Sequence, residues 1–261
     1  EAISRGLSRL DNRLPYIACQ GNHDLGYIAA EYRYSMMPNY IYPERNSTFA
    51  KTLVSTGTNY EGIHTMENSA YEFHDEAWGD LLIISFEFAP RDEALEWARQ
   101  LIESDRFVNH KVIILTHSFL ATNGDRIVEE GYKLTPRNWA QAVWEKLIYP
   151  SKNIKMVLCG HTGNPPKIRK GEEVDYHMTT SYRADKAADG HEVVQMMFNS
   201  QNGDGSWNGN GGDCWLRILE FKPDGKTIGV RTFSPLFALS RHTQHLAWRT
   251  AEYDQFLITI K

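Results

Sequence analysis

The pattern of apolar and polar positions in the first two thirds of the chain is typical of alternating strands and helices. Apolar runs of strand length occur at residues 15–19, 71–73, 81–88, 112–115 and 154–158. Residues 92–104 and 139–148 instead repeat apolar side chains every three or four positions, which predicts amphipathic helices. A shorter helical repeat covers residues 2–10 and ends before Pro15. Together these segments predict an α/β arrangement.

From about residue 174 the pattern changes. Apolar strand-like runs then follow one another without room for helices, at residues 193–198, 215–221, 228–233 and 256–260. Such spacing is typical of antiparallel hairpins. We therefore expect a single domain over residues 1–261, with an α/β part at 1–173 and a β-rich part at 174–261. The Gly- and Asn-rich residues 202–212 predict a long hairpin loop, because they lack the Glu and the spacing of an EF-hand.

Composition supports a folded domain and excludes some classes of partner. The chain is 41% hydrophobic and 12% aromatic, which is far from the composition of disordered proteins. Its net charge of -5 gives no electrostatic support for a nucleic-acid partner. No apolar run approaches the roughly 20 residues that cross a bilayer, so we expect no membrane span. The three cysteines are too scattered for a disulfide framework or a thiolate metal site.

Polar side chains that could bind a ligand or take part in catalysis follow three of the predicted strands. The run Gly21-Asn22-His23-Asp24 comes after residues 15–19, His117 comes after residues 112–115, and Gly160-His161 comes after residues 154–158. Open α/β sheets bind ligands at the carboxyl ends of their strands. A single His in such a place is more often structural, but three at successive strand ends favour a shared site.

These three motifs resemble the third, fourth and fifth motifs of the calcineurin-like metallophosphoesterases, which read Gly-Asn-His-Asp, a lone His after a strand, and Gly-His. The flanking segments also resemble that family, at residues 13–16, 95–97, 215–219 and 228–235. The resemblance covers essentially the whole chain. It implies an α/β/β/α sandwich of two mixed β-sheets flanked by helices, here lacking the first strands of the full fold.

The resemblance also implies a role for each motif residue. Asn22 should bind a metal ion through its amide oxygen, and His117 and His161 should bind the same ion through ring nitrogens. His23 should be catalytic, giving a proton to the leaving oxygen of a phosphoester. Asp24 should hold the other ring nitrogen of His23, an arrangement that prepares an imidazole for acid catalysis.

The implied cofactors are two divalent ions, which would clamp a phosphoester and convert a bridging water into hydroxide. Imidazole and amide ligands suit Zn, Mn or Fe and do not suit Ca. The implied partner is a small-molecule or protein phosphoester, whose identity depends on loops. The polar residues 25–69 frame the site, and side chains that could line its mouth are Arg45, Tyr60, His64, Asn123 and Arg183.

The chain departs from the family pattern in two ways. The first two family motifs, Asp-x-His and Gly-Asp-x-x-Asp, are missing, since only twenty residues precede Gly21. Those motifs supply the acidic ligands, so we expect two ions in a longer full-length protein and at most one weakly held ion here. The fifth motif also has Gly163 where the family has a second His. His177 is a candidate substitute.

Two hypotheses about function follow. The first is a metal-dependent phosphoester hydrolase, either a phosphatase or a phosphodiesterase. We expect its activity to be absent or impaired in the present chain. The second is a binding or scaffolding module that keeps the fold without hydrolysis. Gly163 favours the second hypothesis, whereas the paired His23 and Asp24 favour the first. The type of C-terminal ending favours an exported, periplasmic or extracellular protein, and the upstream coding sequence would separate the two hypotheses.

Overall fold

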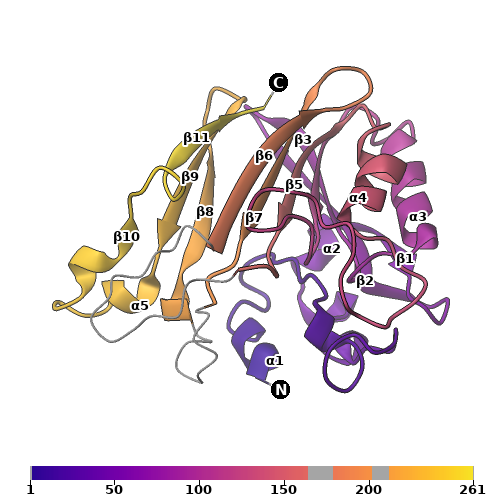
Figure 1. Ribbon diagram of the computed structural model, residues 1–261, viewed down its shortest axis with the longest axis horizontal. Coiled ribbons are helices and arrows are strands. Elements are labelled where there is room, and N and C mark those ends of the chain that lie inside the picture. Colours follow the sequence, from indigo (N-terminus) through magenta and orange to yellow (C-terminus); the bar gives the residue numbers. More distant parts are fainter. Residues whose placement is uncertain (1, 164–178, 202–211, 261) are drawn as a thin grey trace.

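Two β-sheets packed face to face form the centre of the molecule (Figure 1). The computed structural model describes residues 2–163, 179–201 and 212–260. Within these residues the larger sheet has seven strands in the order β1-β2-β3-β4-β5-β7-β6. The strands are β1 Leu53–Thr58, β2 His64–Asp75, β3 Gly79–Ser85, β4 Lys111–Leu115, β5 Ile154–Cys159, β6 Thr180–Lys186 and β7 Glu192–Phe198.

Parallel pairing in the larger sheet gathers several strand ends at one edge. Strands β3, β4, β5 and β7 are parallel neighbours, so their carboxyl ends lie together. Strand β6 is antiparallel to β7 and pairs Thr180 with Phe198. The loops that follow β4 and β5 therefore leave the sheet side by side, which is where ligands of α/β sheets bind.

The smaller sheet is antiparallel and closes one face of the larger sheet. In the described residues it consists of β8 Leu216–Phe221, β9 Thr227–Phe233, β10 Trp248–Arg249 and β11 Phe256–Thr259. The core between the sheets joins Ile113 and Met156 to Ile228, Val230 and Ile258. Strands β6 and β7, which also follow residue 174, belong to the larger sheet.

Helices cover the other face of the larger sheet (Figure 1). The longest is α3 Asp92–Glu103, and α4 Ala140–Val143 continues into a π-helical turn at Trp144–Ile148. Shorter helices are α1 Ala2–Leu7, α2 Phe49–Thr52 and α5 Pro235–Ala238, with 3₁₀ turns at Asn22–Asp24, Met37–Asn39, Pro43–Arg45, Gly212–Cys214 and Gln244–Leu246. No helix among the described residues is long and apolar enough to cross a membrane.

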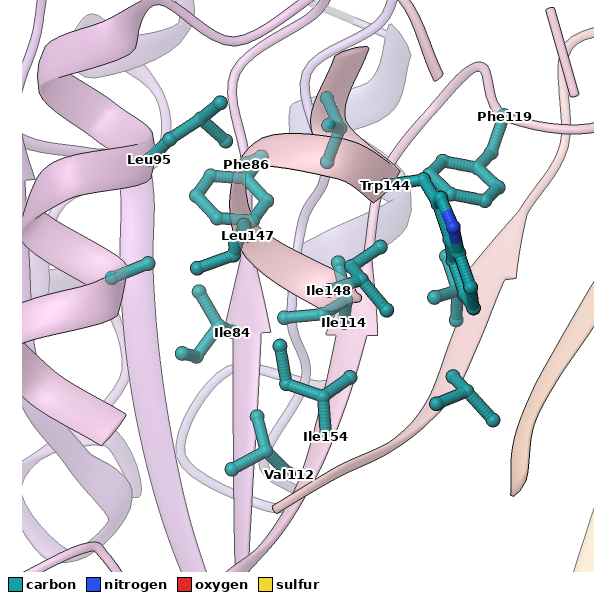
Figure 2. Close-up of a cluster of buried hydrophobic side chains, with 14 of the residues drawn as sticks. Ile84, Phe86, Leu95, Val112, Ile114, Phe119, Trp144, Leu147, Ile148 and Ile154 are labelled. Carbon is teal, nitrogen blue, oxygen red and sulfur yellow. The ribbon is translucent and has the colours of Figure 1, made fainter. Parts of the chain in front are cut away.

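The main hydrophobic core lies between these helices and the larger sheet. Figure 2 shows Leu95 of α3 and Leu147 of the π-helical turn beside Ile84 and Ile114 of the central strands. In β4 the side chains alternate, so Ile113 faces the smaller sheet while Ile114 faces the helices. Burial of each such side chain contributes roughly 1.5–3 kcal/mol. Packing on both faces of the larger sheet therefore holds β4 and β5 in place, and with them the loops that follow these strands.

The predicted fold class, mixed α/β with helices packed on a sheet, is confirmed. The strand predicted at residues 15–19 is wrong. This segment forms no strand, and the carbonyl of Ala18 accepts a hydrogen bond from Oγ of Ser85 at 3.2 Å. The described residues also place no helical layer over the outer face of the smaller sheet, where only the short α5 lies at one end (Figure 1).

Candidate metal centre

The structure brings the three predicted ligands together at the carboxyl edge of the larger sheet. Asn22 begins a 3₁₀ turn, and His117 and His161 follow β4 and β5. Oδ1 of Asn22 lies 2.9 Å from Nε2 of His117. Nδ1 of His161 lies 3.1 Å from the same nitrogen. An amide oxygen and two ring nitrogens therefore converge on one point.

Glycine at position 21 allows this close approach. A Cβ atom at Gly21 would lie 3.0 Å from Cε1 of His117 and 3.2 Å from both of its ring nitrogens. The backbone of Gly21 is extended, with φ -103°, so the need for glycine here is steric. The loops are also tied to each other, because the N–H of Gly160 donates to the carbonyl of His117 at 2.9 Å.

Side chains from residues 118–132 orient two of the three ligands. Nδ2 of Asn22 donates to the hydroxyl of Tyr132 at 2.9 Å, which turns Oδ1 toward His117. Nε2 of His161 lies 2.7 Å from Oε1 of Glu130, and Oγ of Ser118 donates to the other carboxylate oxygen at 2.9 Å. Because a carboxylate only accepts hydrogen bonds, His161 carries its proton on Nε2 and keeps a lone pair on Nδ1.

Sequence reasoning missed Glu130 and Tyr132. Both lie in residues 126–138, which have neither strand nor helical periodicity and no family motif. Nothing in the sequence pattern distinguishes Glu130 from its neighbour Glu129. Only the fold shows that one of the two carboxylates reaches His161.

Burial keeps His117 neutral. Burial lowers the pKa of His117 to about 4, and the neighbouring His161 acts in the same direction, while Glu130 opposes them. The ring of Phe88 adds an aromatic wall, with its centroid 5.8 Å from the His117 ring and 5.9 Å from the His161 ring. A neutral imidazole is the form that binds metal ions.

The hydrogen-bonding pattern of the centre fits a cation. Oδ1 of Asn22 and Nδ1 of His161 both present lone pairs toward Nε2 of His117, and with the His117 proton on Nδ1 all three atoms would offer lone pairs to a cation. Amide oxygen and imidazole nitrogen are suitable ligands for Zn, Mn or Fe. Among residues 2–163, 179–201 and 212–260, no three His, Cys, Asp or Glu side chains come together as a metal-binding group. Glu130 contacts the His161 nitrogen that points away from His117.

His23 lies near this centre, but its partner differs from the expected one. Nδ1 of His23 lies 2.8 Å from the carbonyl oxygen of Ile28. The carboxylate of Asp24 instead accepts the backbone N–H of Gly21 at 2.8 Å. The expected hydrogen bond between Asp24 and His23 is therefore replaced, because a carboxylate three residues from Gly21 closes the 3₁₀ turn locally. Both side chains line a cavity of about 420 Å³.

Position 163 is closely packed in the structure. A Cβ atom at Gly163 would lie 3.1 Å from Nδ2 of Asn199, and that nitrogen donates to the carbonyl of His161 at 2.9 Å. A larger side chain at this position would have to displace Asn199. The proposed substitute ligand His177 lies outside the described residues.

Two of the side chains suggested for the mouth of the site form ion pairs. Arg45 is paired with Asp11 at 3.0 Å, and Arg183 is paired with Asp185 at 2.6 Å. The other three, Tyr60, His64 and Asn123, are exposed, and all five assignments to the mouth stay predictions.

Comparison with known proteins places the chain in a family. The family model described as calcineurin-like phosphoesterase matches residues 1–165. The uncharacterized protein YvnB of Bacillus subtilis (strain 168) is 25% identical over 235 residues, which are 88% of this chain and 15% of that protein.

Among solved structures, the purple acid phosphatase PPD1 from yellow lupin (Lupinus luteus) seeds matches with a TM-score of 0.41 and 16% identity, over 94% of this chain and 41% of that one. The family match covers more than half of the chain and includes all three motifs. The chain belongs to the calcineurin-like phosphoesterase family.

Proposed function

We propose that this chain carries part of the metal centre of a phosphoester hydrolase. The observation that carries the proposal is the convergence of Asn22, His117 and His161 on one point at the carboxyl edge of the sheet. Membership in the calcineurin-like phosphoesterase family supports the reaction class. The substrate would be a small-molecule or protein phosphoester, cleaved as a phosphatase or a phosphodiesterase does.

The three converging groups would hold one divalent ion, Zn, Mn or Fe. When bound, such an ion supplies Lewis acidity toward a phosphoryl oxygen and lowers the pKa of bound water. All three groups are neutral, so we infer that the ion is held weakly. A second ion would need further ligands, of the acidic kind that the described residues do not gather into a metal-binding group. The dinuclear centre therefore belongs to a longer protein in this proposal.

His23 would act on the leaving group. The carbonyl of Ile28 can only accept a hydrogen bond, so Nδ1 of His23 carries a proton and the ring is held in one orientation. This leaves Nε2 as the nitrogen that gives a proton to the leaving oxygen. The side chain of His23 is exposed, as a group that meets a substrate must be. Asp24 would serve by shaping the turn that presents His23.

One observation favours a second function. The side chain of Asn199 packs against Gly163, where the family has a second His. A subgroup of the family that lacks this ligand could keep the fold as a phosphoester-binding module that does not hydrolyse its ligand. Both functions include binding of a phosphoester, but only the hydrolase would cleave it.

The test combines metal binding with turnover. Isothermal titration with Mn²⁺ and Zn²⁺ should give about one equivalent for the present chain. The variant H117A should lose binding, because His117 touches both other ligands. In a longer form that carries the acidic motifs, H23A should keep its metal content and lose most of its hydrolysis of bis(4-nitrophenyl) phosphate. General acid catalysis contributes about 10²–10⁴-fold to rate.

Three outcomes separate the possibilities. Unchanged metal binding in H117A would contradict the proposed metal centre. Metal binding without turnover in the longer form would favour the binding module. Equal loss of metal and turnover in H23A would remove the role of His23 as an acid.

A further inference from the structure

A short segment, residues 130–132, contacts two of the three converging side chains from outside the centre. Glu130 accepts a hydrogen bond from Nε2 of His161 at 2.7 Å. Tyr132 accepts one from Nδ2 of Asn22 at 2.9 Å. Neither contact involves the atoms that face His117. Each contact therefore acts on the orientation of a ligand and leaves its metal-binding atom free.

Glu130 determines which nitrogen of His161 faces the centre. A free neutral imidazole exchanges its proton between two nitrogens, and only the nitrogen without a proton can bind a metal. The carboxylate of Glu130 requires the proton on Nε2, which leaves the lone pair on Nδ1. Ser118 donates to the second oxygen of this carboxylate at 2.9 Å, so the carboxylate cannot turn away freely. Its side chain is only 13% exposed.

Tyr132 plays the matching part for Asn22. An amide group can present either oxygen or nitrogen to a neighbour, and only its oxygen binds a metal ion. Because the amide nitrogen of Asn22 donates its hydrogen bond to the hydroxyl of Tyr132, the amide oxygen faces His117. The Tyr132 ring is held by packing against Phe88, with ring centroids 5.2 Å apart. The hydroxyl therefore has a fixed place.

Glu130 also brings a negative charge to a centre whose ligands are neutral. A carboxylate behind a metal-bound imidazole makes the ring a stronger ligand, and loss of such a carboxylate typically costs 10–100-fold in metal affinity. Part of the missing acidic character of the centre is thus supplied through His161.

We propose that residues 130–132 are a positioning segment for the metal centre, with Glu130 selecting the tautomer of His161 and Tyr132 selecting the oxygen of Asn22. The proposal rests on the proposed metal centre. It goes beyond that centre in assigning ligand orientation to a loop that carries no family motif.

The first experiment reads the tautomer without any metal. Long-range ¹H–¹⁵N NMR of the metal-free chain distinguishes a protonated Nε2 from a protonated Nδ1 in His161. The wild type should show the proton on Nε2. The variant E130Q should show a mixture of tautomers, because an amide can both accept and donate. The neighbouring variant E129Q is the matched control, since Glu129 is exposed, and it should show the wild-type signal.

The second experiment measures affinity for Zn²⁺ by competition with a chromophoric chelator. E130Q should weaken binding about 10–100-fold. Y132F should weaken it about 2–10-fold, the effect of one ordinary hydrogen bond, and should leave the His161 tautomer unchanged. The control variants E129Q and Y149F should stay within about twofold, since Tyr149 lies at the opposite end of β5. Thermal melts check that all variants are folded.

The outcomes keep this inference separate from the proposed function. A wild-type chain that binds no metal contradicts the proposed centre, while the NMR result still decides whether Glu130 selects the tautomer. Normal metal binding in both E130Q and Y132F, or a tautomer that does not respond to E130Q, overturns the positioning segment and leaves the centre standing.

Discussion

Replacement of Gly21 by alanine tests the geometry of the centre without removing a ligand. The new Cβ would lie 3.0 Å from Cε1 of His117, closer than side-chain atoms normally approach. Because φ at Gly21 is -103°, alanine adopts this backbone without strain. The whole cost therefore comes from the contact with His117, whose ring is also enclosed by Phe88.

Overpacking of this kind typically costs about 1–3 kcal/mol. For a chain of this size each kcal/mol corresponds to a Tm decrease of roughly 2–4 °C. The displaced ring should also move Nε2 of His117 away from Asn22 and His161, so G21A should weaken Zn²⁺ binding as well. Chemical denaturation and chelator competition measure the two effects.

A double-mutant cycle provides the decisive control. In the H117A background the clash is gone, so G21A should cost close to nothing, and the coupling energy should equal the cost in the wild type. The matched variant G6A lies in α1 with no atom within 4 Å of the added Cβ, and should be neutral or slightly stabilising. The same cost of G21A in both backgrounds would refute the position of the His117 ring.

Two further predictions concern stability. Hydrogen bonds from Arg183 lower the pKa of Asp185, so Asp185 stabilises the fold above its ordinary pKa of about 3.9 and this stability is lost as pH falls through the lower folded value. Denaturation from pH 7 to pH 3 should show the advantage of the wild type over D185N shrinking with acidity, and a constant advantage would contradict it. I114A, at a fully buried position, should cost about 2–5 kcal/mol, whereas L239A, at a position 87% exposed, should stay within about 0.5 kcal/mol. Similar losses in urea unfolding would contradict the described core.

The central strands were predictable because their physical signal is strong. Strand β4 is buried between two cores and reads as an uninterrupted apolar run at residues 112–115, and β5 and β7 are apolar apart from Lys155, Glu192 and Gln195. The convergence of His117 and His161 followed from the same signal, since parallel strands deliver their carboxyl ends to one edge. The roles of these residues in metal binding stay predictions.

Strand β2 was not fully predicted because its buried positions are polar. Glu67, Asn68 and Ser69 are all buried in β2 and break the apolar pattern. Two of them have distant partners, since Gln20 donates to Glu67 at 2.6 Å and the N–H of Glu87 donates to Asn68 at 3.0 Å, whereas Ser69 donates locally to the carbonyl of Met66. Partners from elsewhere in the chain leave no local trace in the sequence. The same reason explains why Glu130 and Tyr132 were missed.

The partner of Asp24 was mispredicted for a different reason. The resemblance to the family implied a hydrogen bond with the ring of His23, whereas the carboxylate accepts the N–H of Gly21. A short side chain can bond to its own backbone at little entropic cost. Sequence similarity identifies which residues stand near the centre, but the competition between local and distant partners is decided by the backbone.

The most direct test of the centre is anomalous X-ray scattering from crystals of this chain soaked in Zn²⁺. The proposed centre predicts an anomalous peak bonded to Oδ1 of Asn22, Nε2 of His117 and Nδ1 of His161. A peak bonded to other side chains, or no peak at this edge of the sheet, would contradict it.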